Sequence, residues 1–157
     1  MTRTIALFTD FGSRDIYVGQ LHAAGKRMGL DGCLVDLFHD VNPYDISAGA
    51  SLLAAMLDYL PHDAIVVGVV DPGVGGERLP IAVELGERWL VGPDNGLFSR
   101  SVAWSTVGAR YWILESPINV AKTFHGRDIF LPAAIELVGG DFRRIRRADD
   151  LGHISPR

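Results

Sequence analysis

The sequence predicts an α/β domain: a three-layer, Rossmann-like arrangement in which helices cover both faces of a mixed, mainly parallel sheet. The chain has 157 residues, 48% of them hydrophobic, which suits one domain with its own core. Apolar runs alternate with segments of helical spacing, as in α/β proteins. The run "AIVVGVV" at residues 64–70 contains no polar alternation. Such a run is typical of a strand covered on both faces in a parallel sheet.

The first half of the chain is expected to alternate strands with helices. Short β-rich runs at residues 4–9 and 32–38 predict strands, and a weak 3–4 apolar spacing indicates a helix over 15–28. A loop rich in turn-forming residues, 39–47, precedes a clearer helix. The apolar face of that helix holds Gly49, Leu52, Leu53, Met56 and Leu60.

The second half is expected to add a hairpin, a short helix, a strand and a longer helix. These elements are assigned to residues 79–85 with 88–93, 95–104, 109–115 and 128–140. The basic run at residues 143–147 is interpreted as a solvated helix end or a contact surface. We assign residues 1–150 to the domain and 151–157 to the start of a linker.

Composition narrows the classes of function. A net charge of −4 argues against a nucleic-acid partner, which calls for a clustered basic surface. No apolar run approaches the length that spans a bilayer, so no membrane partner is expected. Cys33 is the one cysteine and lies in an apolar run, where we expect a small buried side chain and no internal disulfide. The chain opens directly into strand-like sequence without a signal peptide, and a reducing, cytoplasmic location is the expectation.

Polar residues that directly follow apolar runs are the candidate site, because ligands of open α/β sheets bind beyond the carboxyl ends of the strands. Asp10 follows the first strand in "FTDFGSRD" and could accept hydrogen bonds from ribose hydroxyls, or form a local turn or helix cap. Asp71 follows the longest apolar strand, and the loop "DPGVGGER" should return Arg78 to within ion-pair reach. That pair could serve chemistry or simply clamp the turn.

A third candidate is His125, which precedes the last expected helix in "FHGRDIF". Free N–H groups at a helix start favour negative charge, and a histidine there could act as a base or proton relay, or be a surface residue. Tyr44 could cover a ligand or pack in a turn. His39 and Asp40 could suggest a metal, yet no ligand set has a recognisable spacing, so no metal or other cofactor is expected.

Five stretches together resemble one family: "TDFGSRDIYVGQ", "VDLFHDVNPYDISAGA", "VVDPGVGGER", "GPDNGL" and "FHGRDIFLPAA". In this order they are similar to the S-adenosylmethionine hydrolases, also called S-adenosyl-L-methionine hydroxide adenosyltransferases, which are relatives of the fluorinating and chlorinating enzymes. The resemblance covers essentially the whole chain. It implies hydrolysis of S-adenosyl-L-methionine to adenosine and L-methionine by attack of water at C5′ of the ribose.

The resemblance also implies residue roles. Asp71, Arg78 and His125 match the family's water-activating set, which the halogenating relatives lack. Asp10 matches the carboxylate that holds the ribose hydroxyls, and Tyr44 matches an aromatic position beside the ribose and sulfonium. Further substrate-binding candidates in the same motifs are Phe11, Asn95, Phe124 and Gly126. His22 stands where relatives often carry lysine.

The family normally adds a C-terminal β-barrel domain, and its active site forms between subunits of a homotrimer. This chain is expected to lack that domain, because it ends at "LGHISPR", about where the domain would begin. Two alternatives to the hydrolase therefore stay open. One is a non-catalytic half-domain that binds S-adenosylmethionine or a nucleoside and needs a partner chain. The other is a 5′-halogenase of the same family.

Overall fold

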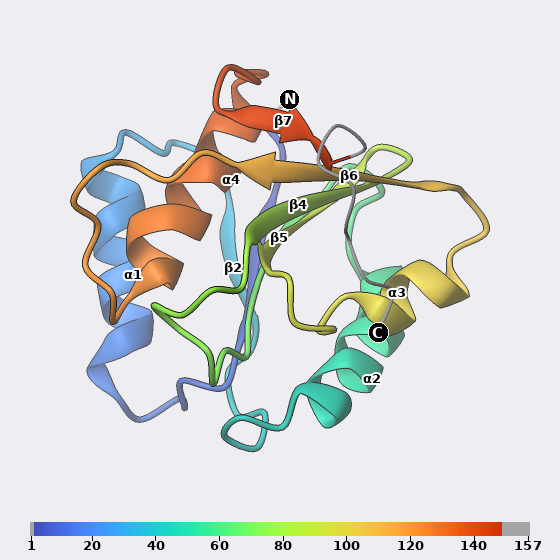
Figure 1. Ribbon diagram of the computed structural model, residues 1–157, viewed down its shortest axis with the longest axis horizontal. Coiled ribbons are helices and arrows are strands. Elements are labelled where there is room, and N and C mark those ends of the chain that lie inside the picture. Colours follow the sequence, from blue (N-terminus) through green and yellow to red (C-terminus); the bar gives the residue numbers. More distant parts are fainter. Residues whose placement is uncertain (1, 149–157) are drawn as a thin grey trace.

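The computed structural model describes residues 2–148 and places one sheet between two helical layers (Figure 1). The sheet has seven strands in the order β2-β1-β3-β5-β4-β6-β7. The strands are β1 (Ile5–Thr9), β2 (Leu34–Phe38), β3 (Ile65–Val69), β4 (Pro80–Leu85), β5 (Arg88–Pro93), β6 (Ala109–Leu114) and β7 (Ile145–Arg147). The linker expected at residues 151–157 lies outside the described residues.

Strand directions confirm a mixed, mainly parallel sheet. β1 pairs in parallel with β2 and β3, and β3 pairs in parallel with β5. β4 is antiparallel to both β5 and β6, and β7 is antiparallel to β6. Thus β2, β1, β3, β5 and β6 run one way, while β4 and β7 run the other way. The β4–β5 pairing is the hairpin that the sequence predicts.

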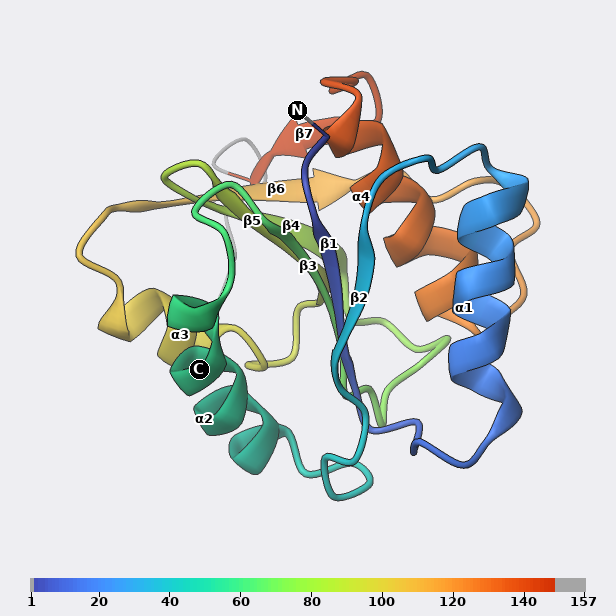
Figure 2. The ribbon, with the colours of Figure 1, turned by 180° about the vertical axis from the view of Figure 1, so that it is seen from behind.

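Helices cover both faces of the sheet, as Figures 1 and 2 show from opposite sides. The helices are α1 (Ile16–Arg27), α2 (Ile46–Met56), η1 (Leu57–Tyr59), α3 (Ser99–Trp104), the π-helical turn η2 (Gly126–Phe130) and α4 (Leu131–Val138). α1, η2 and α4 lie on one face, and α2, η1 and α3 lie on the other. Among residues 2–148, no helix is long and apolar enough to cross a membrane.

Alternate side chains of the central strands enter two separate cores. On β1, Ile5 and Leu7 pack with Leu21 of α1 and Leu137 of α4. Ala6 and Phe8 point to the opposite face and pack with Leu53 of α2. Because both faces are covered, β1 and β3 are buried along their whole length, which explains their unbroken apolar sequence.

Gly68 and Gly92, which lie on neighbouring strands, let the start of α3 approach the sheet closely on the face that α2 covers. A Cβ at Gly92 of β5 would lie 2.2 Å from the carbonyl oxygen of Gly68 in β3 and 2.8 Å from the Phe98 ring. A Cβ at Gly68 would lie 2.8 Å from the same ring. The phenyl ring of Phe98 therefore occupies the space that side chains at these two positions would need.

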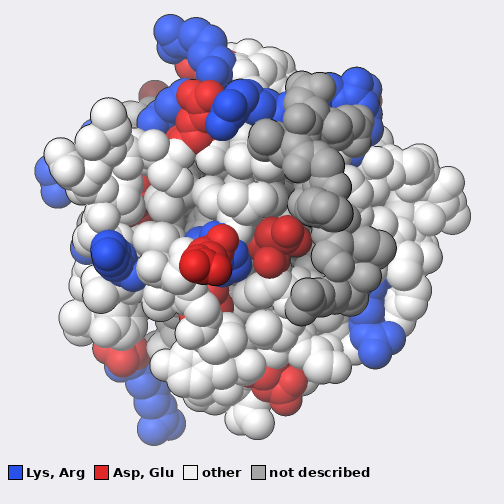
Figure 3. Space-filling view, viewed as in Figure 1, with Lys and Arg blue, Asp and Glu red and all other residues white. Residues whose placement is uncertain are grey.

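The structure corrects the helix-end interpretation of the basic run. Residues 145–147 form β7, because Ile145 packs on the core and the strand pairs with β6. Arginines beside and within β7 pair with acids: Arg144 with Glu136, and Arg146 with Glu115 at 3.1 Å. Blue and red side chains intermingle over β7 at the top of Figure 3.

The expected burial of Cys33 and the expected length of the second helix are wrong. Cys33 is exposed, because it precedes β2, the edge strand of the sheet. The second helix ends at Met56 and gives way to the 3₁₀ turn η1, so Leu60 lies beyond it.

Candidate active site

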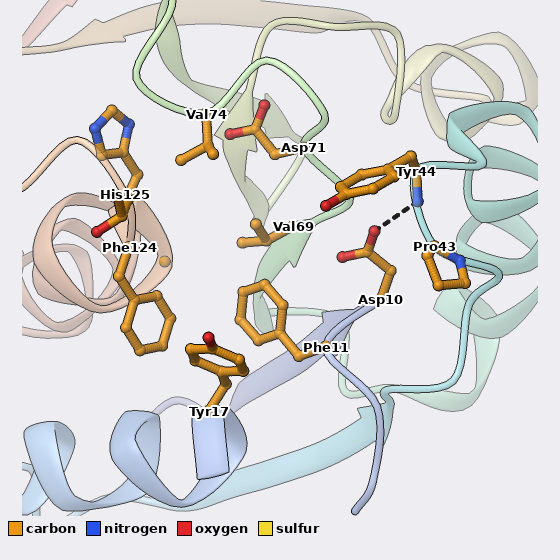
Figure 4. A pocket seen from close by; sticks show the side chains of 12 residues that line it. Asp10, Phe11, Tyr17, Pro43, Tyr44, Val69, Asp71, Val74, Phe124 and His125 are labelled. Atoms are coloured by element: carbon orange, nitrogen blue, oxygen red, sulfur yellow. Dashed lines mark hydrogen bonds between the residues drawn. The ribbon is translucent and has the colours of Figure 1, made fainter. Parts of the chain in front are cut away.

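A cavity of about 250 Å³ opens at the carboxyl ends of β1 and β3, where the sheet meets the start of η2. The residues predicted for the site that line it are Asp10, Phe11, Tyr44, Asp71, Phe124, His125 and Gly126. Figure 4 shows Asp10 and Tyr44 on one side and Phe124 and His125 on the other, with Val69 and Asp71 between them. Segments far apart in sequence thus meet at the place where the strand-end rule locates ligands.

Arg78 joins Asp71 to His125, as the loop length led us to expect for the first two. Its Nε donates to Asp71 Oδ1 at 3.1 Å and to Oδ2 at 3.0 Å, and its Nη2 also donates to Oδ2. The same Nη2 lies 2.9 Å from His125 Nδ1. The Asp71 and Arg78 side chains are only 3% and 11% exposed. Arg78 is not among the cavity-lining residues, so it connects the two others from behind.

The glycine-rich loop between Asp71 and Arg78 allows this contact. Gly75 has φ of 74°, a left-handed conformation that favours glycine. A Cβ on Gly75 would lie 2.5 Å from the carbonyl oxygen of Lys122. The loop therefore packs directly against the segment that leads into His125, and any larger residue at position 75 would push the two apart.

The contact with Arg78 fixes which nitrogen of His125 carries a proton. A guanidinium only donates hydrogen bonds, so Nδ1 must be the acceptor and a neutral His125 carries its proton on Nε2. Burial lowers the pKa of His125 below its usual 6.5, and the positive charge of Arg78 lowers that pKa further. The neutral form is therefore favoured at neutral pH.

We expect Arg78→Met to raise the pKa of His125, because the substitution removes a repelling cation and leaves the attraction of Asp71 unopposed. Histidine ring NMR over a pH titration measures the change. Arg110→Met is the matched control, since Arg110 pairs with Glu84 on the exposed side of β6. An unchanged midpoint in Arg78→Met would contradict the assigned contact.

Asp10 is held by a partner distant in sequence. Its Oδ2 accepts a hydrogen bond from the backbone N–H of Tyr44 at 2.8 Å (Figure 4). Its own N–H donates to the carbonyl of Val69 at 3.2 Å. Burial raises the pKa of Asp10 above 3.8, and the charge of Asp71 adds to this effect, against the hydrogen bond from Tyr44. The carboxylate is therefore held by the backbone of the Tyr44 loop, and it lines the cavity.

Tyr44 adopts a backbone conformation that is rare for a bulky residue. Its φ is 63°, and its side chain is largely exposed at the cavity mouth. Such a strained conformation persists only where surrounding contacts hold it. Residues of this kind are often found at functional sites. The hydrogen bond from its N–H to Asp10 is one such contact.

Three aromatic rings form one wall of the cavity. The ring centroids of Phe11 and Phe124 lie 5.6 Å apart, and that of Tyr17 lies 5.9 Å from Phe11 and 5.4 Å from Phe124. Two of the three pairs are edge-to-face, the arrangement that aromatic quadrupoles favour. The wall supplies an apolar surface beside the carboxylates.

The structure also differs from the predicted set. Asn95 is not among the cavity-lining residues: its amide donates to the carbonyl of Val70 at 2.8 Å and so fastens the end of β3. Lining residues that the sequence analysis missed are Tyr17, Pro43, Val69, Val74 and Thr123. Tyr17 could have been found as an aromatic residue in the first turn of the helix that follows Asp10. In residues 2–148, no three His, Cys, Asp or Glu side chains are grouped so that they could hold a metal.

Comparisons with known proteins identify relatives over most of this chain. The family model for the SAM hydroxide adenosyltransferase N-terminal domain matches residues 5–145. A protein of Thermus thermophilus named (R)-S-adenosyl-L-methionine hydrolase is 40% identical over 88% of this chain and 58% of its own length. A protein of the same name from Methanocaldococcus jannaschii is 34% identical over 85% of this chain and 52% of its own length. The chain therefore spans little more than half the length of these relatives.

Two solved structures have the same fold as this chain. An uncharacterized conserved protein from Thermotoga maritima superposes with a TM-score of 0.82 at 32% identity, over 91% of this chain and 57% of its own. A conserved hypothetical protein from Thermus thermophilus superposes with a TM-score of 0.76 at 35% identity, over 97% of this chain and 62% of its own. The sequence match runs through every segment that builds the cavity. The chain belongs to the SAM hydroxide adenosyltransferase N-terminal domain family.

Proposed function

We propose that this chain carries the water-activating part of an S-adenosyl-L-methionine hydrolase, which forms adenosine and L-methionine. The observation that carries the proposal is the connected set of Asp71, Arg78 and His125 beside a cavity that also holds Asp10. The names of the curated relatives support the same substrate and reaction.

The charges at the cavity suit a cationic substrate. Arg78 offsets the charge of Asp71, and His125 favours its neutral form, so Asp10 contributes an excess negative charge. A sulfonium group is positive before the reaction and neutral after it. The cavity should therefore attract S-adenosyl-L-methionine more strongly than methionine, the product that leaves.

The difficult part of the reaction is the nucleophile. The departing thioether is neutral and needs no general acid, whereas free water has a pKa of about 15.7. In the proposed geometry, the Nε2–H of His125 donates to the water oxygen and orients it, and the Asp71 carboxylate accepts its proton. The water oxygen bonds to C5′ as the C5′–S bond breaks, and that electron pair stays on sulfur.

Incubation with S-adenosyl-L-methionine in ¹⁸O-water tests the proposal. In a version extended by the family's C-terminal β-barrel domain, chromatography with mass detection should show adenosine with ¹⁸O in its 5′-hydroxyl, and Asp71→Asn should form at least about a hundredfold less. The 157-residue chain alone should turn over S-adenosyl-L-methionine poorly or not at all. Formation of 5′-chloro-5′-deoxyadenosine with added chloride would indicate a halogenase instead. Binding of S-adenosyl-L-methionine without any product would indicate a non-catalytic binding module.

The remaining features implied by the resemblance belong to the same proposal. We propose a cytoplasmic location and no nucleic-acid or membrane partner. Where the C-terminal domain is present, we propose a homotrimer whose site is completed by a neighbouring subunit. We also propose residues 1–150 as the domain and 151–157 as the start of a linker. Sedimentation of the purified protein and fractionation of the source cells test the assembly and the location.

We expect Asp10→Ala to weaken adenosine binding by about 1.5–3 kcal/mol, the range for hydrogen bonds to a charged group. The substitution removes the carboxylate that we assign to the ribose hydroxyls. Calorimetric titration with adenosine measures the loss. Asp58→Ala, an exposed aspartate in η1, is the control and should bind as the wild type does. Equal affinities for both variants would make Asp10 a structural residue only.

A further inference from the structure

A second network of polar side chains lies behind the cavity and takes no direct part in the proposed chemistry. It runs from Asp36 on β2 through His39 to Thr9, the last residue of β1. Asp36 Oδ1 lies 2.9 Å from His39 Nε2, and His39 Nδ1 lies 2.7 Å from Thr9 Oγ1. Thr9 is 0% exposed and His39 is 6% exposed. Buried polar groups with this many partners have a definite orientation.

The carboxylate of Asp36 sets the directions of these hydrogen bonds when His39 is neutral. Partial burial raises the pKa of Asp36, but the hydrogen bonds from His39 and His22 outweigh burial and hold this pKa below 3.8. An ionised carboxylate only accepts, so a neutral His39 places its proton on Nε2 and leaves Nδ1 as an acceptor. The hydroxyl of Thr9 must then donate to Nδ1.

The hydroxyl oxygen of Thr9 remains free to accept a hydrogen bond, and the backbone N–H of Phe11 supplies it at 3.1 Å. The loop at residues 39–40 makes two more contacts with the turn that follows Asp10. Gly12 N–H donates to the carbonyl of His39 at 2.7 Å, and Ser13 N–H donates to Asp40 Oδ1 at 2.9 Å. Three successive amides after Asp10 are thus held by the 39–40 loop, directly or through Thr9.

A nucleophilic role for Thr9 does not fit these contacts, although carboxylate, imidazole and hydroxyl follow one another as in hydrolytic triads. The Thr9 side chain is fully buried and is not among the residues that line the cavity. Its hydroxyl also already accepts from Phe11 N–H. The network therefore acts on the backbone of the turn and not on a substrate.

We propose that His39 and Thr9 are positioning residues for substrate binding, which hold the Asp10–Phe11 turn so that the carboxylate of Asp10 and the ring of Phe11 face the cavity. The inference rests on the proposed function, since it assigns these two side chains to the nucleoside site. Loss of the Thr9 hydroxyl would leave the Phe11 N–H and His39 Nδ1 without partners in a buried place, which favours a shifted turn.

Paired substitutions separate positioning from simple stability. Thr9→Val keeps the shape and removes the hydroxyl, whereas Thr9→Ser keeps the hydroxyl. His39→Leu removes both nitrogens, whereas His39→Asn places an amide oxygen near the position of Nδ1. We expect Thr9→Val and His39→Leu to raise KM for S-adenosyl-L-methionine and Kd for adenosine about tenfold, with kcat changed less than about threefold. Thr9→Ser should stay within about twofold of the wild type, and His39→Asn should recover part of the loss.

A lower unfolding temperature combined with wild-type KM and Kd in Thr9→Val would overturn the inference, because it would show a structural role only. Two NMR measurements on the free chain keep the test independent of activity. His39 should show the Nε2–H tautomer, and the Phe11 amide should exchange about tenfold faster in Thr9→Val than in Thr9→Ser. Equal Phe11 exchange in the two variants would also overturn the inference, even if the wild-type chain bound no nucleoside. Failure of the wild type to bind would count against the proposed function alone.

Discussion

Asp71→Asn is expected to lower kcat for hydrolysis of S-adenosyl-L-methionine by about 10²–10⁴-fold, the range for loss of a general base. An amide cannot take a proton from water at neutral pH. Asparagine would also present an N–H group, or at best one oxygen, to an arginine that now donates to both carboxylate oxygens. The water would lose its acceptor and Arg78 would lose its fixed orientation.

Binding of substrate should change far less, because Asp10 and the aromatic wall remain. Calorimetry on Asp71→Asn should give an affinity for adenosine, which is neutral, within about threefold of the wild type, which separates binding from chemistry. Asp58→Asn is the matched control, in which an exposed aspartate outside the cavity changes in the same way. Wild-type kcat in Asp71→Asn would remove Asp71 from the proposed mechanism.

Gly92→Ala is expected to lower the free energy of unfolding by about 3 kcal/mol or more, because it overpacks the contact between β5, β3 and Phe98. The new Cβ would lie 2.2 Å from the backbone oxygen of Gly68 and 2.8 Å from Phe98. A backbone oxygen in a neighbouring strand cannot move away without opening the sheet. The free energy of unfolding, measured with urea, should fall accordingly, or the chain should fail to fold.

Gly108→Ala is the control for that experiment, because a Cβ at Gly108 would have no heavy atom within 4 Å. Its stability should stay within about 0.5 kcal/mol of the wild type, as for most surface changes. Equal stability of the two variants would mean that the contact between β3, β5 and Phe98 is looser than the structure indicates.

The sequence predicted the parts of the fold that depend on local pattern. Continuous apolar runs indicated the buried strands, and Gly86 with Glu87 indicated the hairpin. The pairing of Arg78 with Asp71 also followed, because a short glycine-rich loop leaves few other places for the arginine. By contrast, the contact of His125 with Arg78 joins positions far apart in the chain, and motif resemblance alone brought them together beforehand.

The predictions that were wrong or incomplete all concern residues whose surroundings are set by tertiary contacts. The basic run became β7 because the edge of β6 was free to pair with it, which no local pattern reveals. Cys33 is exposed because β2 lies at the edge of the sheet. A single apolar run does not reveal the position of its strand in the sheet. Tyr17 was missed because its role depends on the neighbouring rings of Phe11 and Phe124.

The burial of the Asp71–Arg78 pair should make the electrostatic potential near Asp71 insensitive to ionic strength. Mobile ions weaken attraction between exposed charges but reach buried pairs poorly. The side chain of Arg143, paired with Asp141 on the surface, is 88% exposed, whereas those of Asp71 and Arg78 are almost completely enclosed. Added salt should therefore loosen the surface pairs while the local potential around Asp71 stays nearly constant. That potential is set by the fold and not by the surrounding medium.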